Sequence, residues 1–377
     1  MGDTLPLILN SELLDRIESK DIKLVGTDLD GLVTNLHNDL LHELMFRDLV
    51  RHLPEEYRKE LERKSLQEIA GEVELSLGWF LDTNTGYLVL PNYLDDSNGK
   101  VTEAKAGNMK LGQKKLLRTY GKGIISLKQP LHPDTNPPDF LPYCDGFDVV
   151  EFVVKSYMVK KHGTGKGLMR TIQRAVHRMH SKEGFKDELL ADPGKYGITA
   201  NKYLKEALKE LGEKYTLFLM SNSPADYVAR LTGILGIDEL YHLTIPDAGK
   251  PAAFHPGTSE HEIMWSHFHA RGLNVERPDQ VLYIGDHDMK DIHHAKAPGE
   301  FWTALRMPRA ELRALQSLLK KNAGIEFERH DDPGYMRAIH PGPNPRLDNL
   351  NYMAAQILQR ADVVTTKLEK LVPILLQ

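Results

Sequence analysis

The sequence predicts an α/β fold in which a doubly wound, parallel sheet is interrupted by an inserted module. In the second half of the chain, short apolar runs alternate with segments of helical periodicity, and strands separated by helices form a parallel sheet with both faces covered. Between about residues 54 and 192 this alternation gives way to charged helical stretches, short aromatic strands and turns. The chain of 377 residues also exceeds the length at which one hydrophobic core usually stops growing.

The first expected element is a buried strand at residues 22–27, which ends at the turn Asp28-Leu29-Asp30-Gly31. A helix with one apolar face follows at residues 38–53. Inside the insertion, the aromatic runs at residues 79–81 and 87–90 predict short strands.

The regular alternation resumes with a helix that contains residues 204–211 and a strand at residues 216–220 that ends at Ser221-Asn222. Ser223 is expected to cap the next helix, with Pro224 at its first position. Further strands are expected at residues 240–245, 281–284 and 301–305.

These patterns predict three parts of the chain. Residues 1–53 and 193–345 are expected to form the core, and residues 54–192 an inserted cap or substrate-specificity module. Residues 346–377 show helical periodicity, including residues 363–376, and predict a C-terminal helical tail. That tail would pad the core or support a homo-oligomer.

Composition excludes several classes of protein. The chain has 48 basic and 53 acidic residues, a net charge of −5, and 27% charged residues, which is typical of a globular domain and not of a polycation that binds nucleic acid. The only cysteine, Cys144, cannot form an internal disulfide, so a reducing compartment is expected. No signal-peptide pattern and no apolar run of about 18 residues occurs, so we expect a cytoplasmic protein without a membrane partner.

Polar residues follow the ends of the expected strands. In an open parallel sheet, ligands bind beyond the carboxyl ends of the strands. The residues at these positions are Asp28, Asp30, Ser221, Asn222, Lys250, Asp286 and Asp291. Two carboxylates ~4 Å apart repel by about 4 kcal/mol at an effective dielectric constant of about 20. A hard divalent cation relieves this repulsion, and oxygen ligands without a histidine or cysteine pattern favour Mg²⁺.

The order of these segments resembles the four motifs of the haloacid dehalogenase (HAD) superfamily of phosphatases. The segments are Asp28-Leu29-Asp30-Gly31-x-x-Thr34, Ser221-Asn222, Lys250-Pro251, and Gly285-Asp286 with Asp291. Tyr283-Ile284-Gly285-Asp286-His287, Asp247-Ala248-Gly249-Lys250-Pro251 and Phe80-Leu81-Asp82-Thr83 further resemble the cytosolic purine 5′-nucleotidase and 5′-nucleotidase domain-containing branch. The resemblance implies a HAD-like Rossmannoid core with a cap inserted after the first motif.

The resemblance also implies roles for individual residues. Asp28 would attack phosphorus and become an aspartyl phosphate, and Asp30 would protonate the leaving group and then activate water. Ser221, with the backbone amide of Asn222, would bind phosphate oxygens. Lys250 would neutralise the charge of the substrate and of the intermediate.

The implied metal site consists of the Asp28 carboxylate, the Asp30 carbonyl and Asp286, with Asp291 as an outer, orienting carboxylate. The resemblance therefore implies a Mg²⁺-dependent phosphomonoesterase, with a nucleoside 5′-monophosphate as substrate. One alternative is a phosphatase or phosphotransferase for another small phosphate ester, such as a sugar phosphate. An alternative from another class is a regulatory module that binds nucleotide without catalysis.

Overall fold

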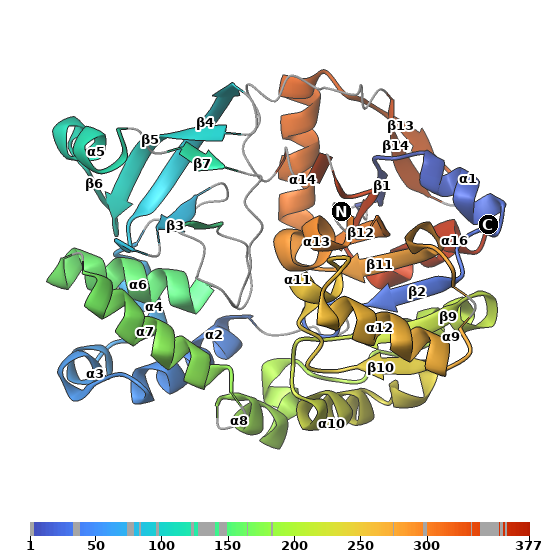
Figure 1. Cartoon of the computed structure of the whole chain (residues 1–377), viewed down its shortest axis with the longest axis horizontal. Coiled ribbons are helices and arrows are strands. Elements are labelled where there is room, and N and C mark those ends of the chain that lie inside the picture. The colour runs from blue at the N-terminus through green and yellow to red at the C-terminus, as the bar shows by residue number, and fades with distance from the viewer. Residues whose placement is uncertain are drawn as a thin grey trace. The chain divides into compact units, whose positions relative to one another are not determined.

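The structure is a computed structural model, and its chain divides into two compact units (Figure 1). Unit 1 comprises Met1–Asn35 and Ile198–Gln377, and unit 2 comprises Leu36–Gly197. The residues that the structure describes are 4–32, 38–73, 79–82, 84–95, 98–121, 124–126, 140–142, 149–163, 165–181, 184–273, 275–296, 300–332, 334–339, 354, 357–358 and 360–377. Thr83 and Cys144 therefore lie outside the described residues.

Unit 1 is built on a sheet in which nine strands are described, in the order β10-β9-β2-β11-β12-β15-β1-β14-β13. The strands are β1 (Leu7–Ile8), β2 (Leu24–Thr27), β9 (Thr216–Met220), β10 (Leu243–Ile245), β11 (Val281–Gly285), β12 (Trp302–Arg306), β13 (Glu326–His330), β14 (Tyr335–Ile339) and β15 (Val363–Thr365). From β10 to β15 neighbouring strands are parallel, as the alternation of strands and helices predicts. The predicted α/β fold is confirmed.

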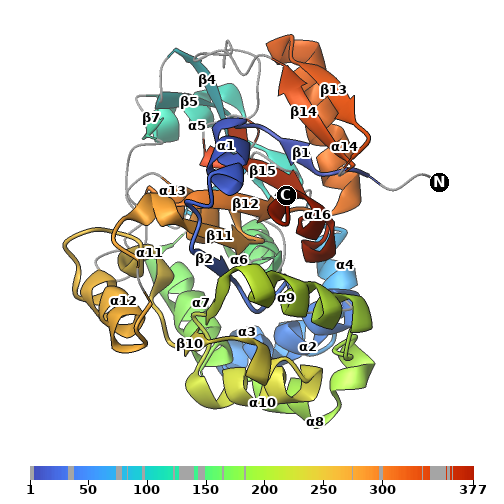
Figure 2. The same ribbon diagram turned by 90° about the vertical axis from the view of Figure 1, so that its right-hand side faces the viewer.

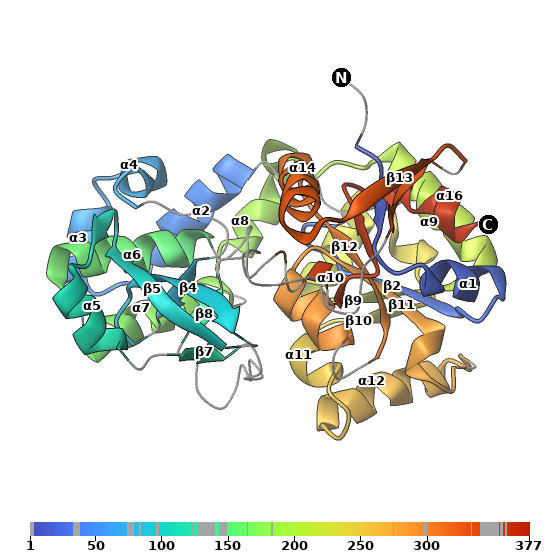
Figure 3. The same cartoon turned by 90° about the horizontal axis from the view of Figure 1, so that it is seen from above.

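Helices cover both faces of this sheet, and Figure 3 shows α12 and α9 on opposite faces. The helices of unit 1 are α1 (Glu12–Glu18), α9 (Lys202–Lys214), α10 (Ala225–Leu235), α11 (Lys250–Ala253), α12 (Ser259–Ala270), α13 (His294–Lys296), α14 (Arg309–Leu318) and α16 (Val372–Leu375). Shorter helical turns are η2 (Asp238–Leu240), η3 (Pro278–Gln280), η4 (Asp288–His293), η5 (Leu319–Ala323) and η7 (Leu368–Lys370).

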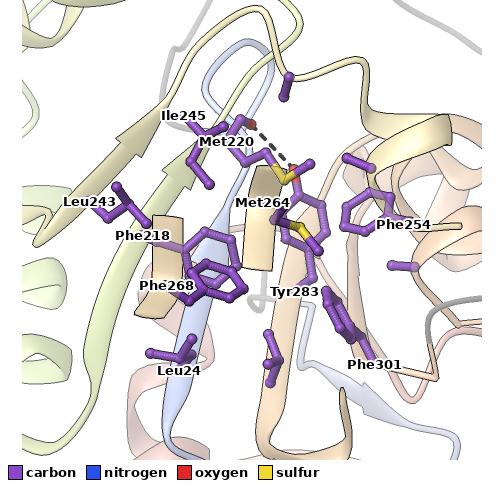
Figure 4. Packing of buried hydrophobic residues seen from close by; sticks show 14 of the residues in the cluster. Leu24, Phe218, Met220, Leu243, Ile245, Phe254, Met264, Phe268, Tyr283 and Phe301 are labelled. Atoms are coloured by element: carbon purple, nitrogen blue, oxygen red, sulfur yellow. Dashed lines mark hydrogen bonds between the residues drawn. The ribbon is translucent and has the colours of Figure 1, made fainter. Parts of the chain in front are cut away.

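The core between α12 and the sheet of unit 1 combines aliphatic and aromatic side chains (Figure 4). Phe268 of α12 packs edge-on against Phe218 of β9, with ring centroids 5.0 Å apart. In the neighbouring strand β2, a Cβ at Gly26 would lie 2.1 Å from the Phe218 ring, so only glycine leaves room for that ring. Phe218 therefore packs between Phe268 of α12 and the backbone of β2 at Gly26, and this contact holds β2 and β9 together. The first motif follows β2 and the second motif follows β9.

The C-terminal segment differs from the expected helical tail. Residues 363–365 form β15, which lies between β12 and β1 in the sheet (Figure 2). The helical periodicity expected over residues 363–376 is therefore wrong at its start, because the apolar residues Val363 and Val364 are buried in a strand. The segment belongs to unit 1, and α16 packs against α9.

Unit 2 contains a second, antiparallel sheet with the described order β6-β5-β4-β3-β8, and β7 pairs with β5. Its strands are β3 (Phe80–Asp82), β4 (Leu88–Asp95), β5 (Asn98–Ala106), β6 (Met109–Lys110), β7 (Ile124–Ser126) and β8 (Phe140–Pro142). Its helices are α2 (Asn38–Arg51), α3 (Glu55–Leu61), α4 (Leu66–Ala70), α5 (Gln113–Tyr120), α6 (Val149–His162), α7 (Lys166–Met179) and α8 (Lys186–Ala191), with the turn η1 (Pro193–Tyr196).

The boundaries of the units also differ from the expected ones. Helix α2 packs against α6 and α7 and so lies in unit 2, whereas the sequence analysis places residues up to 53 in the core. The apolar face of α2 is equally compatible with either unit, so its periodicity could not assign it. Among the described residues, no helix is long and apolar enough to span a membrane.

Candidate active site

All four motif segments meet at the carboxyl edge of the sheet of unit 1. Strand β2 lies between β9 and β11, so the residues that follow these strands come together. The backbone N–H of Asp28 donates to the carbonyl of Ile284 at 2.9 Å, which continues the pairing of β2 with β11 beyond the last strand residue. The topology therefore places Asp28 beside the Gly285-Asp286 turn.

Lys250 connects two of the predicted carboxylates. Its Nζ donates to Asp28 Oδ1 at 2.8 Å and to Asp291 Oδ1 at 2.6 Å. All three residues are buried, and Asp291 has no exposed surface. A buried ion pair of this kind is held by accurate geometry, because each buried charge needs its partner. The structure thus brings the first, third and fourth motifs together in unit 1.

Asn222 fixes the segment that carries Lys250. Its Oδ1 accepts the backbone N–H of Lys250 at 2.8 Å, at the first residue of α11. The neighbouring Ser221 is joined to strand β10 because its N–H donates to the carbonyl of Ile245 at 3.0 Å. The Asn222 side chain therefore has a contact that the sequence analysis did not assign, since only its backbone amide was expected to act.

Three carboxylates form a cluster at this edge. Asp28, Asp286 and Asp291 each offer an oxygen, and these oxygens lie within 4.8 Å of one another. Two glycines allow the close approach. A Cβ at Gly31, where φ is +77°, would lie 1.7 Å from Asp286 Oδ2, and a Cβ at Gly285 would lie 2.3 Å from the Cβ of Asp291.

The electrostatics of the cluster favour an additional positive charge. Burial, together with the charges of Asp291 and Asp30 and against the opposing effect of Lys250, raises the pKa of Asp28 to about 7. Burial and the charges of Asp28 and Asp291 also raise the pKa of Asp286 well above its usual range. Burial alone would lower the pKa of Lys250, but the two carboxylates that it contacts raise it above its usual value. One ammonium group thus faces three carboxylates.

Asp30 has different surroundings from the other predicted carboxylates. Its Oδ2 accepts a hydrogen bond from Ser223 Oγ at 3.0 Å, and its Oδ1 accepts one from Tyr227 Oη at 2.9 Å. The sequence predicts Ser223 as a helix cap and Pro224 as the first helical residue. In the structure α10 begins at Ala225 with Pro224 as its N-cap, so the expected serine cap is wrong.

Two residues near the site were missed by the sequence analysis. Tyr227 lies in the first turn of α10, and its hydroxyl group contacts the same carboxylate as that of Ser223. Arg306 is the last residue of β12, and its charge partly offsets the raised pKa of Asp286. The rule that selects polar residues at the carboxyl ends of strands could have found Arg306, because a strand was expected at residues 301–305.

Comparison with known families decides what kind of protein carries this site. A model of the 5′ nucleotidase family matches residues 14–264, which is more than half of the chain. The chain belongs to the 5′ nucleotidase family. This membership confirms the predicted resemblance to the 5′-nucleotidase branch and the expectation of a phosphoric monoester hydrolase.

Solved structures of HAD hydrolases are similar to parts of this 5′ nucleotidase family member. The HAD-hydrolase YfnB from Bacillus subtilis is 12% identical, with a TM-score of 0.34, and the match covers 76% of this chain and 90% of that one. A HAD phosphatase from Thermococcus onnurineus is 14% identical, with a TM-score of 0.34 and coverage of 76% and 87%. L-2-haloacid dehalogenase from Xanthobacter autotrophicus is 14% identical, with a TM-score of 0.33 and coverage of 93% and 97%. A search of curated proteins found no match.

Proposed function

We propose that this 5′ nucleotidase family member is a Mg²⁺-dependent phosphomonoesterase that hydrolyses nucleoside 5′-monophosphates through a phosphorylated Asp28. The observation that carries the proposal is the contact of the Lys250 ammonium with Asp28 and Asp291, at 2.8 and 2.6 Å, beside the carboxylate of Asp286. Family membership supports the nucleotide substrate. Unit 2 is proposed to supply substrate specificity.

The residues present fit a hard divalent cation. The cluster offers carboxylate oxygens only, and its three carboxyl groups outnumber the single ammonium group of Lys250, so burial and mutual repulsion raise the pKa of Asp28 and of Asp286. Asp28, Asp286 and the backbone carbonyl of Asp30 would hold Mg²⁺, and Asp291, which also accepts the backbone N–H of His287 at 3.1 Å, would orient the site from outside. When bound, Mg²⁺ would stabilise negative charge on the phosphoryl group.

The protein residues would act in two steps. In the first, an Asp28 oxygen forms a bond to phosphorus, the bond from phosphorus to the leaving oxygen breaks, and Asp30 gives that oxygen a proton. In the second, Asp30 takes a proton from water as the water oxygen bonds to phosphorus and Asp28 is released. Lys250, Ser221 and the backbone amide of Asn222 would hold the phosphate oxygens throughout.

The decisive experiment compares the wild type with Asp28→Asn on a panel of phosphate esters in the presence of Mg²⁺. We expect the wild type to prefer nucleoside 5′-monophosphates over sugar phosphates, and Asp28→Asn to lower kcat by at least about 10³-fold. A preference for sugar phosphates, or product formed on an added alcohol in place of water, would replace the nucleotidase proposal with one of its alternatives. Nucleotide binding without turnover by the wild type would indicate a regulatory module.

The cellular location and the self-association of the protein also remain proposals. The cytoplasmic location, expected from the lack of a signal-peptide pattern or a long apolar run and consistent with the single cysteine, is tested by cell fractionation. Self-association into a homo-oligomer is tested by sedimentation of the full chain. Neither outcome alters the catalytic proposal.

A further inference from the structure

The carboxylate of Asp30 is held at both oxygens by hydroxyl groups from one short segment. Ser223 Oγ donates to Oδ2 at 3.0 Å, and Tyr227 Oη donates to Oδ1 at 2.9 Å. The segment is itself fixed, because the backbone N–H of Ser223 donates to Ser221 Oγ at 3.1 Å and its carbonyl accepts the N–H of Asp247 at 3.0 Å. Both hydroxyl groups are therefore presented from a firmly attached support, and the Tyr227 side chain is buried.

The two aspartates of the first motif are thus held by different chemistry. Asp28 contacts the Lys250 ammonium, which can only donate hydrogen bonds, whereas Asp30 contacts two neutral hydroxyl groups. A hydroxyl group can donate or accept, so its contact with a carboxyl group can persist before and after a proton is transferred. This arrangement suits a carboxyl group that must give up a proton and take one back in the same orientation.

We propose that Ser223 and Tyr227 are positioning residues for Asp30. Their hydroxyl groups hold the carboxyl group in the orientation from which its proton reaches the leaving oxygen as the phosphorus–oxygen bond breaks. They hold the same orientation when the carboxylate receives the proton of the attacking water. Neither hydroxyl group is consumed. This inference rests on the proposed function, and it assigns a role to two side chains that the motifs do not include.

A purely structural role for Tyr227 makes a different prediction. If its ring only fills the core, Tyr227→Phe preserves that packing and any loss of activity is the same for every substrate. If its hydroxyl group orients Asp30, the loss depends on how much the leaving group needs a proton. An alkoxide needs one, whereas the 4-nitrophenolate of 4-nitrophenyl phosphate leaves without one.

The test is the ratio of kcat/KM for two substrates, the alkyl phosphate that the wild type hydrolyses fastest and 4-nitrophenyl phosphate. Because kcat/KM reports only the steps up to formation of the aspartyl phosphate, the later attack of water does not enter. We expect Tyr227→Phe and Ser223→Ala each to lower kcat/KM for the alkyl phosphate by about 10–100-fold, and for the aryl phosphate by less than about 3-fold.

Matched variants make the result decisive. Tyr215→Phe also removes a buried tyrosine hydroxyl group, one that donates to the Leu375 carbonyl away from the site, and should leave both kcat/KM values unchanged. Ser223→Thr keeps a hydroxyl group and should restore the wild-type ratio, which tests the proposal even if Tyr227→Phe folds poorly. Equal losses for both substrates, or no loss, would overturn the positioning role alone. A wild type that hydrolyses neither ester would overturn the proposed function, and this inference with it.

Discussion

Gly31 shows how one residue determines the geometry of the carboxylate cluster. Its φ of +77° is unfavourable for other residues, and a Cβ there would lie 1.7 Å from Asp286 Oδ2. We expect Gly31→Ala to lower the free energy of unfolding by about 1–3 kcal/mol through backbone strain. Because Asp286 would also have to move, the affinity for Mg²⁺ should fall at least about tenfold. Urea denaturation and calorimetric titration with Mg²⁺ measure the two effects.

Gly324 provides the control for this substitution. Its φ is +63°, but a Cβ there would meet no atom within 4 Å. Gly324→Ala should therefore lower stability by about 1–2 kcal/mol and leave the affinity for Mg²⁺ unchanged. If both variants bind Mg²⁺ as the wild type does, the close approach of Gly31 to Asp286 has no role in metal binding.

The raised pKa of Asp28 makes stability depend on pH when no metal is bound. Burial raises this pKa from its ordinary value of 3.8 to about 7. Between these values the folded protein holds a proton that the unfolded chain has released, so stability falls as pH rises, by at most about 1.4 kcal/mol per pH unit for one proton. We expect urea denaturation in EDTA to show this fall between about pH 4 and pH 7, and Asp28→Asn to reduce it.

The same linkage predicts how Mg²⁺ acts. The cation competes with the proton for the carboxylates, so added Mg²⁺ should increase the free energy of unfolding more at pH 7.5 than at pH 5.5. An equal increase at both pH values, or a pH dependence that Asp28→Asn leaves unchanged, would show that Asp28 does not titrate in this range.

At the scale of the element, the start of α11 depends on a side chain from the segment that follows β9. Asn222 Oδ1 accepts the N–H of Lys250 at 2.8 Å. Asn222→Ala should lower stability by about 1 kcal/mol, as the loss of a helix cap does, and should also lower kcat about tenfold because Lys250 loses its anchor. Thermal unfolding and steady-state kinetics measure the two effects.

Asn201 is the matched control for Asn222. It caps α9 through its Oδ1, which accepts the N–H of Tyr203 at 3.0 Å. Asn201→Ala should lower stability by a similar amount without a change in kcat. A similar fall in kcat for both variants would mean that general loss of stability, and not the position of Lys250, limits the activity of Asn222→Ala.

Local sequence patterns predicted the elements that place the site. The strands at residues 22–27, 216–220 and 281–284 correspond to β2, β9 and β11, because each is an apolar run bounded by turn residues. The side-chain contacts between the motifs were harder to predict from the sequence. Ser223 has the pattern of a helix cap, and only the three-dimensional packing of α10 beside the loop after β2 directs its hydroxyl group to Asp30.

At the scale of the whole molecule, pairing between distant segments limited what the sequence could predict. Strand β1 comprises only Leu7 and Ile8, too short for a periodic pattern, and it pairs with β14 and β15 from the opposite end of the chain. The parallel direction of the central strands could be predicted from the alternation of strands and helices along the chain. The position of β15 could not be predicted, because the sequence of a buried strand of three residues does not differ from that of a helical turn.

Strand β15 and the helix after it lead to a prediction for the full molecule. Strand β15 pairs with both β12 and β1, and the N–H of Met307 donates to the Thr365 carbonyl at 2.7 Å. The segment also buries the apolar side chains Val363, Val364, Leu368, Leu371, Val372, Ile374 and Leu375. At about 1.5–3 kcal/mol each, their burial contributes on the order of 10–20 kcal/mol, which matches or exceeds the net stability of about 5–15 kcal/mol of a typical domain.

A chain truncated after Asp362 should therefore lose cooperative thermal unfolding and near-ultraviolet circular dichroism, since β1 and β12 lose their shared neighbour. A chain that lacks only Leu376 and Gln377, which are exposed, should unfold like the wild type. If the longer truncation instead unfolds cooperatively at the wild-type temperature and alters only self-association, the segment is an appendage that joins subunits. Loss of folding would mean that the core is completed only when the last residues of the chain enter the sheet.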